Sequence, residues 1–242
     1  LGIYDNPEEL LSISLGSAET TLLKLTSAYS AFVNGGKKIE PNLISRIQDR
    51  RGKTIFKVKN RKCIGCDKFI EEKLDYPKIE NTNEQVFSEE TAYQMTSILS
   101  GAVERGTAKK LKTLKVPLAG KTGTTNDNFD AWFIGFSSNL VIGVYIGFDN
   151  PKTLGKFETG SKAALPIFKH FVEKAVIKSD ARPFKVPKKM TLMVIDPLTG
   201  EKAKFNSKDT IIEAYKSKNI FNGKVLYSDN NRLDTNNILR FY

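Results

Sequence analysis

The chain has 242 residues, 40% of them apolar and 27% charged, which is typical of a soluble globular protein. No apolar run reaches the roughly 18 residues that a membrane-spanning helix needs, and no signal peptide is visible. The net charge of +11 comes from 38 Lys and Arg against 27 Asp and Glu. These cations are scattered and follow no recognised nucleic-acid-binding pattern, so we expect a solvated basic surface and no nucleic-acid partner.

The first residue is Leu1, and the sequence around it reads like the interior of a protein. We therefore expect a fragment of a longer chain, with any targeting or anchoring segment outside these residues.

Hydrophobic periodicity predicts a first helix over about residues 18–33, which Asn34-Gly35-Gly36 ends. A hairpin is predicted over residues 43–58, with Gly52 at a turn position that needs a positive φ. Residues 59–86 are polar and are predicted to be an irregular surface excursion. A second helix is predicted to begin at the N-cap Ser88.

Cys63-Ile64-Gly65-Cys66 contains both cysteines of the chain. A zinc site would need two further ligands, and the single histidine, His170, is distant in sequence. A local disulfide in an oxidising compartment is the favoured interpretation. Two unpaired thiols stay open as an alternative.

The clearest strand signal covers residues 129–136 and 140–148, which are dense in aromatic and β-branched residues. Glycines interrupt both runs and suggest close helix packing on one face. A third helix follows from about Gly160, with Pro166 in its first turn or bending it. His170 lies on this helix and is interpreted as a structural or surface residue.

The stretch from Ala119 to Thr125 places a lysine, two threonines and a glycine on a short strand. Side chains alternate along a strand, so Thr122 and Thr124 share a face. Gly123 leaves the backbone bare, so another chain can lie close against it. With the charge of Lys121, these groups suit an extended peptide that ends in a carboxylate.

Lys121-Thr122-Gly123 is also a motif of penicillin-binding proteins and class A β-lactamases. Other stretches match the same family in the same order, and these are residues 14–20, 28–36, 120–126, 130–135 and 160–168. Together they resemble the C-terminal half of a class A penicillin-binding protein transpeptidase domain, over residues 1 to about 178.

The resemblance implies an α+β fold in which helices flank an antiparallel sheet of roughly five strands when whole, as in penicillin-binding proteins and serine β-lactamases. In this reading residues 1–178 are the C-terminal part of the transpeptidase domain and residues 179–189 are a linker. Residues 190–242 are a C-terminal extension, which we expect to be loosely held from about residue 205.

The resemblance also implies a peptidoglycan D,D-transpeptidase, in which a serine attacks the D-Ala-D-Ala bond of a stem peptide and an amine of a neighbouring stem takes the acyl group. β-Lactams would mimic the dipeptide. Lys121 would support catalysis electrostatically, Thr122 and Thr124 would bind the terminal carboxylate on either side of Gly123, and the N–H of Thr124 would form half of the oxyanion hole. Neither a metal nor a cofactor is expected. The implied location is the periplasmic face of the bacterial inner membrane.

The sequence departs from the family because no Ser has Lys three residues after it, so the nucleophile motif is absent. Three stretches mimic the Ser-x-Asn motif, but all follow Lys121 and are rejected; they begin at Ser137, Ser217 and Ser228. We expect the serine and its lysine to lie upstream, in the missing N-terminal part of the domain, and this chain to be inactive alone. The alternative is a non-catalytic module that binds wall peptide or a partner protein, and a basic nucleic-acid binder ranks third.

Overall fold

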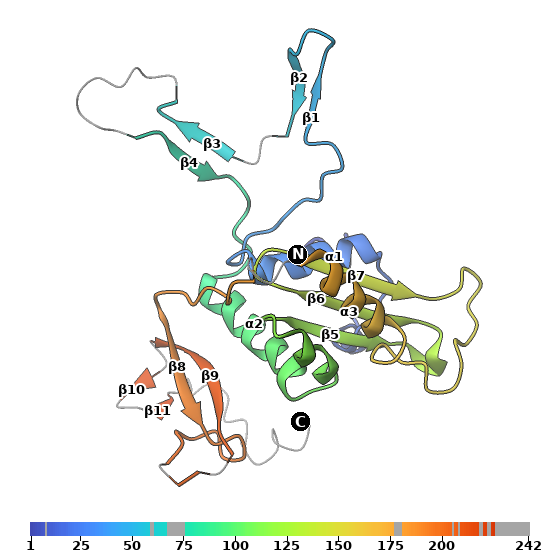
Figure 1. Cartoon of the computed structure of the whole chain (residues 1–242), viewed down its shortest axis with the longest axis vertical. Coiled ribbons are helices and arrows are strands. Elements are labelled where there is room, and N and C mark those ends of the chain that lie inside the picture. Colours follow the sequence, from blue (N-terminus) through green and yellow to red (C-terminus); the bar gives the residue numbers. More distant parts are fainter. Residues whose placement is uncertain are drawn as a thin grey trace.

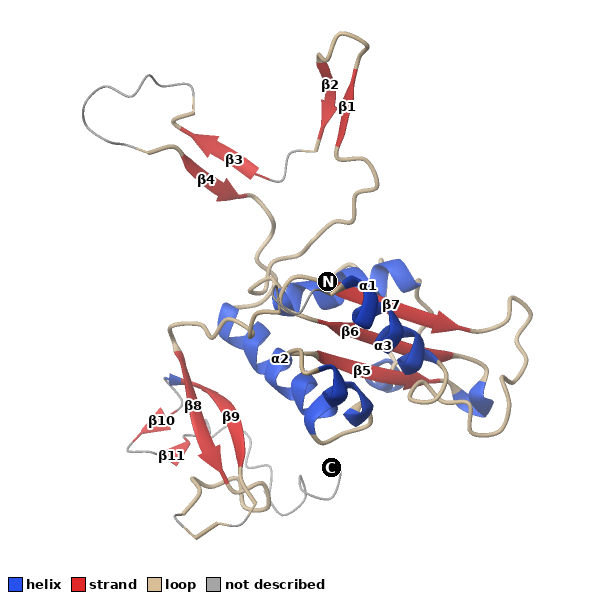
Figure 2. Cartoon of the chain, viewed as in Figure 1, coloured by secondary structure: helices blue, strands red, loops and turns tan. Residues whose placement is uncertain are grey.

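The computed structural model describes residues 1–7, 9–58, 61–66, 76–176, 181–204, 206–207, 209–217, 220–221 and 224–225. A sheet with helices on both faces forms its centre, and two hairpins extend from this body (Figure 1). The same view coloured by secondary structure places the helices around the three central strands (Figure 2).

The central sheet is antiparallel and has the strand order β5-β6-β7. Its strands are β5 (Ala119–Thr124), β6 (Ala131–Phe136) and β7 (Val141–Ile146). The predicted aromatic hairpin is confirmed, and Ser137-Ser138-Asn139 lies in the turn between β6 and β7. In the described part of the chain β5 pairs with β6 alone, so β5 is an edge strand.

Helix α1 (Leu22–Val33) covers one face of the sheet. It lies so close to Gly143 that a Cβ there would meet the hydroxyl of Thr26 and approach Leu22 Cδ1 to 2.8 Å. The helix begins later than residue 18 because Thr21 is its N-cap, with Thr21 Oγ1 accepting a hydrogen bond from Lys24 N–H at 3.2 Å.

Helix α3 (Ala164–Ala175) covers the opposite face. A Cβ added to Gly135 would lie 2.7 Å from the ring of Phe168 on this helix. Gly135 is the neighbour in β6 of Ile134, and Ile134 pairs with Gly143 of β7. Successive strand residues face opposite sides, so α1 and α3 sandwich the sheet. The predicted α+β architecture with helices on both faces is confirmed, and Pro166 lies in the first turn of α3.

Two apolar clusters fill the space between the helices and the sheet. The cluster on the α3 side consists of Val103, Ala108, Leu111, Leu114, Leu118, Phe133, Ala164, Leu165, Phe168 and Val172. The cluster on the α1 side consists of Leu99, Ala119 and Phe136 with partly buried neighbours. β5 therefore starts in the core, and its second half leaves it.

Helix α2 (Glu89–Glu104) lies beside β5 and contributes to both clusters (Figure 1). The predicted N-cap is confirmed, because Ser88 Oγ accepts a hydrogen bond from Thr91 N–H at 3.2 Å. Glu90 lies in the first turn, where its own backbone N–H and the Ser88 hydroxyl lower the pKa of its carboxyl. A 3₁₀ segment, η2 (Lys109–Leu114), leads from α2 towards β5.

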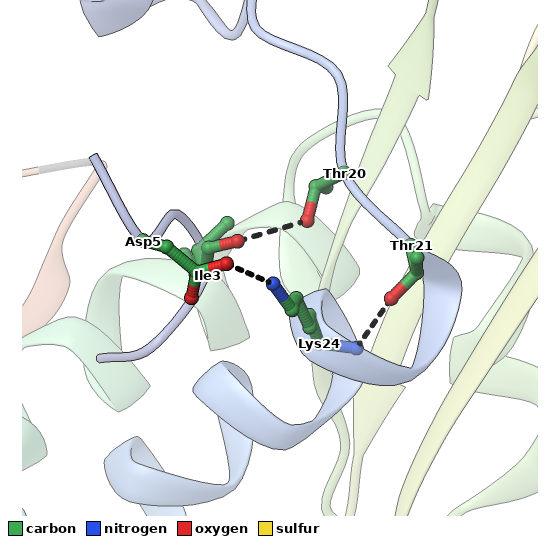
Figure 3. A network of polar contacts seen from close by, with 5 residues as sticks. All are labelled: Ile3, Asp5, Thr20, Thr21 and Lys24. Atoms are coloured by element: carbon green, nitrogen blue, oxygen red, sulfur yellow. Dashed lines mark hydrogen bonds and ion pairs between the residues drawn. The ribbon is translucent and has the colours of Figure 1, made fainter. Parts of the chain in front are cut away.

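The first residues of the chain contact the start of α1. A short 3₁₀ segment, η1 (Leu11–Leu15), lies between them in the sequence. Thr20 Oγ1 donates to Ile3 O at 3.3 Å, and Lys24 Nζ lies 3.2 Å from Asp5 Oδ2 (Figure 3). The Asp5 carboxylate is largely exposed, so this ion pair adds little stability.

Two hairpins connect α1 to α2 and stand away from the body (Figure 1). The first pairs β1 (Arg46–Gln48) with β2 (Thr54–Lys57), and Gly52 has the predicted positive φ of 81°. The second pairs β3 (Arg61–Ile64) with β4 (Lys78–Asn81), which corrects the expectation of an irregular excursion. The pair that closes this hairpin, Ile64 and Lys78, is separated by 14 positions in the sequence, so no short turn pattern marks the hairpin. Cys63 and Cys66 form a disulfide at the end of β3.

After α3, β8 (Met190–Ile195) pairs with β9 (Ile211–Lys216), and two short strands follow, β10 (Ile220–Phe221) and β11 (Lys224–Val225). Lys216 Nζ donates to Thr91 Oγ1 at 2.8 Å, and Gln94 Nε2 donates to Ala214 O at 3.1 Å. These contacts join β9 to α2, whereas the expectation of a loosely held segment beyond about residue 205 stays a prediction. The expectation for residues 226–242 falls outside the described residues.

Among the described residues, no helix combines the length and apolar character that crossing a membrane requires. The same residues contain no group of three or more His, Cys, Asp or Glu that could hold a metal ion.

Candidate functional site

The predicted site residues lie together on the exposed half of the edge strand β5. Ala119 and Gly120 at its start are buried, whereas Lys121 and Thr124 are exposed and Thr122 and Gly123 are half-buried. The strand pairs with β6 along its whole length, from Thr124 opposite Ala131 to Ala119 opposite Phe136, without a break. Their placement on this strand follows the prediction; their roles stay predictions.

Gly123 is packed against Trp132 of β6 and against the loop that contains Gly160. A Cβ on Gly123 would lie 3.1 Å from Trp132 Cβ, on the residue with which it pairs in β6. A Cβ on Gly160 would meet Trp132 O and would lie 2.5 Å from Gly123 O. The loop before α3 therefore rests directly on the β5–β6 backbone at Gly123.

The hydroxyls of the two threonines each have a partner from another segment. Thr122 Oγ1 lies 3.1 Å from Thr107 Oγ1, and either hydroxyl can be the donor. Thr124 Oγ1 accepts a hydrogen bond from Gly160 N–H at 3.1 Å. No local signal pointed to Thr107, and Gly160 stood out only as the first residue of a stretch that resembles the family.

Lys121 holds its ammonium against its own strand. Its Nζ donates to Thr122 O at 2.8 Å, and the side chain is exposed. Lys121 occupies the register position opposite Ile134, so it points to the α1 side, whereas Thr122 and Thr124 point to the α3 side. The strand thus presents a cation on one face and two hydroxyls on the other.

The segment between β5 and β6 includes the 3₁₀ turn η3 (Asn126–Asn128) and is closed by Thr125 and Asp130. Thr125 Oγ1 accepts from Asp130 N–H at 2.8 Å, and Tyr145 Oη donates to Asp130 Oδ1 at 2.9 Å. This hydrogen bond to a carboxylate raises the pKa of Tyr145 above its usual 10.0. The Tyr145 ring lies 4.7 Å from that of Trp132, so Trp132 packs on its neighbour in the sheet.

No nucleophile with an adjacent base accompanies β5 in the described residues. His170 lies on α3 with its side chain 72% exposed, as expected for a surface histidine, and its only ion-pair partner among them is Glu173 at 4.0 Å. Ser137 hydrogen-bonds Asn139 within a hairpin turn, in agreement with its rejection as a Ser-x-Asn motif. The other rejected stretches extend into residues outside the described part, 218–219 and 228–230.

A hollow of about 710 Å³ lies at the other end of the sheet, near the β6–β7 turn. Its lining includes Phe32, Tyr93, Asn139, Arg182 and Phe184, and none of its lining residues belongs to β5. The exposed groups on β5 therefore lie outside this hollow.

Comparison with known proteins gives sequence matches to one family. Residues 4–173 match the model of the penicillin binding protein transpeptidase domain. Penicillin-binding protein 1A of Rickettsia prowazekii is 44% identical over 222 residues, which cover 90% of this chain and 28% of that protein. The Pseudomonas aeruginosa protein of the same name is 32% identical over 86% of this chain and 29% of its own length. The chain thus spans less than a third of the curated relatives that it matches.

Solved structures give the same result. Penicillin-binding protein 1A from Haemophilus influenzae superposes with a TM-score of 0.70 at 33% identity, over 85% of this chain and 33% of that one. PonA1 from Mycobacterium tuberculosis, solved in complex with penicillin V, has a TM-score of 0.54 at 20% identity, over 73% of this chain and 43% of that one. The second similarity establishes a shared fold alone.

Proposed function

Because this chain belongs to the penicillin-binding protein transpeptidase domain family, we propose that its edge strand β5 binds the terminal carboxylate of a peptidoglycan stem peptide in a D,D-transpeptidase. The observation that carries this proposal is the clustering of Lys121, Thr122 and Thr124 on the exposed half of an edge strand. A cation and hydroxyl donors match a carboxylate, and an edge strand matches an extended peptide.

The chemistry would be acyl transfer through a serine. The serine oxygen would attack the carbonyl of the D-Ala-D-Ala bond, the terminal D-Ala would leave, and an amine would then displace the serine. Thr124 N–H would stabilise the developing oxyanion, and loss of one such donor typically costs on the order of 10²–10³ in rate. Lys121 would add positive potential at the site.

The serine has to come from outside this chain, since no Ser-x-x-Lys occurs in it. We therefore propose that the N-terminal part of the domain supplies the nucleophile and its base. β-Lactams would react with that serine, and their carboxylate would occupy the position of the terminal carboxylate of the stem peptide. A location on the periplasmic face of the inner membrane, with an anchor outside these residues, belongs to the same proposal.

Titration of the 242-residue chain with an N-acetylated peptide ending in D-Ala-D-Ala, followed by amide NMR, tests the binding step. We expect shifts centred on residues 121–124 and a loss of affinity of about tenfold in Lys121→Ala, because the positive potential that attracts the carboxylate is lost. Lys53→Ala, in the exposed turn of the first hairpin, is the matched control and should bind normally. Equal binding by both variants would contradict the proposal.

Fluorescent penicillin tests the missing nucleophile. The chain alone should take no covalent label, whereas a longer protein that contains it together with a Ser-x-x-Lys segment should be labelled. Covalent labelling of the chain alone would show that it contains a reactive nucleophile and would contradict the proposal.

A second function, a non-catalytic module that binds wall peptide, is favoured by one observation, the absent Ser-x-x-Lys. It predicts peptide binding without acylation in the longer protein too, so the penicillin experiment separates it from the transpeptidase.

A further inference from the structure

The hydroxyl of Thr124 is held by a donor that lies 36 residues away in the sequence. Gly160 N–H donates to Thr124 Oγ1 at 3.1 Å. By contrast, Thr122 Oγ1 faces another hydroxyl, that of Thr107, in which either oxygen can donate. Of these two threonines, Thr124 is therefore the one whose oxygen is fixed as an acceptor towards the protein.

A hydroxyl has one O–H donor and two acceptor lone pairs. Once an N–H occupies one lone pair, the hydroxyl hydrogen turns away from that N–H, because the two partly positive hydrogens repel. The O–H of Thr124 is then free to donate to a ligand. We infer that Gly160 is a positioning residue that makes Thr124 a hydrogen-bond donor and so selects an anionic acceptor, the peptide carboxylate. This inference rests on the function proposed for β5.

Only glycine fits at position 160 with the loop at this distance. An added Cβ would meet Trp132 O, and it would lie 2.5 Å from Gly123 O and 3.2 Å from Gly123 N. These atoms belong to paired residues of β5 and β6, which cannot move apart without disrupting the ladder. A side chain at Gly160 would instead lift the loop and lengthen the hydrogen bond to Thr124.

The first turn of α3 fixes the loop on its other side. Leu165 N–H donates to Gly160 O at 2.9 Å, and Ala163 N–H donates to Thr159 O at 2.8 Å. Leu165 is itself buried in the cluster on the α3 side of the sheet. The N–H of Gly160 is thus positioned by the packing of α3, and it is in place before any ligand arrives, so that binding spends little free energy on ordering it.

The amide proton of Gly160 reports this hydrogen bond directly in the ligand-free chain. We expect its NMR resonance to move upfield in Thr124→Val, which removes the hydroxyl at nearly constant shape, and to stay near its original position in Thr124→Ser. An unchanged resonance in Thr124→Val would mean that the hydrogen bond does not form, and would overturn the inference.

Selectivity is measured with two peptides, one ending in D-Ala-D-Ala carboxylate and one in its C-terminal amide. We expect the chain to prefer the carboxylate, and Thr124→Val to lower this preference about tenfold, as for loss of a hydrogen bond to a charged group. Gly160→Ala should lower it about three- to tenfold. In the Thr124→Val background Gly160→Ala should change the preference no further, since it acts through that hydroxyl.

Gly143→Ala is the matched control, because a Cβ there is also crowded, by α1, on the opposite face of the sheet. It should keep the carboxylate preference, provided that thermal unfolding shows both glycine variants to be folded. The inference is overturned if Gly160→Ala leaves the carboxylate preference intact. It is also overturned if Gly160→Ala lowers this preference by the same factor with and without Thr124→Val. In both cases the proposed function stands. A chain that binds both peptides equally well, or neither, overturns both.

Discussion

Asp130 shows how one side chain can tie the end of the β5–β6 hairpin to the neighbouring strand. Its carboxylate accepts the hydrogen bond from Tyr145 Oη at 2.9 Å, and its backbone N–H donates to Thr125 Oγ1. Both contacts lie just beyond Thr124, so they hold the exposed end of β5 in place. The hydrogen bond to Asp130, with smaller effects of burial and of the Asp130 charge, also raises the pKa of Tyr145, so its hydroxyl stays protonated to higher pH than in a tyrosine without these contacts.

We predict that Asp130→Asn lowers the pKa of Tyr145 towards 10.0, measured by NMR titration of labelled tyrosine rings. Because the folded-state pKa is raised, the contribution of Tyr145 to stability is complete below its unfolded pKa and is lost as the pH rises through the folded pKa. Asp130→Asn should therefore weaken the loss of stability above pH about 10. Asp149→Asn is the control, because Asp149 makes the smallest contribution to the shift. An equal decrease of the pKa in both variants would contradict this account.

Helix α2 is the element that connects the candidate site to the rest of the chain. Its last turns approach β5, where Ser100 Oγ donates to Leu118 O at 3.3 Å, and the following loop places Thr107 beside Thr122. Its first turns hold β9 through Thr91 and Gln94. One helix thus supports both the site and the C-terminal hairpin.

Ser88→Ala should destabilise α2 by about 1 kcal/mol, because the orphaned N–H of Thr91 loses its acceptor. Urea unfolding measures the change. Ser88→Asp, which keeps an acceptor at the N-cap, should retain most of the stability. If the two variants were equally destabilised, the hydroxyl would not be the stabilising group.

At the scale of the whole molecule, the body and the hairpins differ in how they are held. The largest fully buried side chains lie in the body, and they include Phe133, Phe136 and Phe168. The strands of the two hairpins between α1 and α2 are almost wholly exposed, and apolar residues such as Ile55 and Ile79 are 64% exposed on them. Stability should therefore depend on the body.

Phe168→Ala should cost about 3–5 kcal/mol, because Phe168 is completely buried and its ring lies 4.8 Å from that of Phe133. Ile167→Ala on the same helix is the matched control, since Ile167 is 52% exposed and should cost much less. Both are measured by urea unfolding. Comparable losses would show that the cluster on the α3 side is not the main stabilising core.

The sequence by itself determined the features that depend on neighbours along the chain. Side-chain alternation put Thr122 and Thr124 on one face of a strand, the N-cap chemistry of Ser88 set the start of α2, and Gly52 marked a turn that needs a positive φ. Each follows from the geometry of a few consecutive residues, so each could be predicted.

Only the tertiary structure decided which distant residues meet at those elements. Gly160 N–H reaches Thr124, Thr107 reaches Thr122, and β9 pairs with β8 across a polar segment. Such contacts leave no periodic or turn signal, because they arise when α2 and α3 bury their apolar faces against the sheet. Packing of whole elements therefore fixed the orientation of groups that the sequence could only place on a strand.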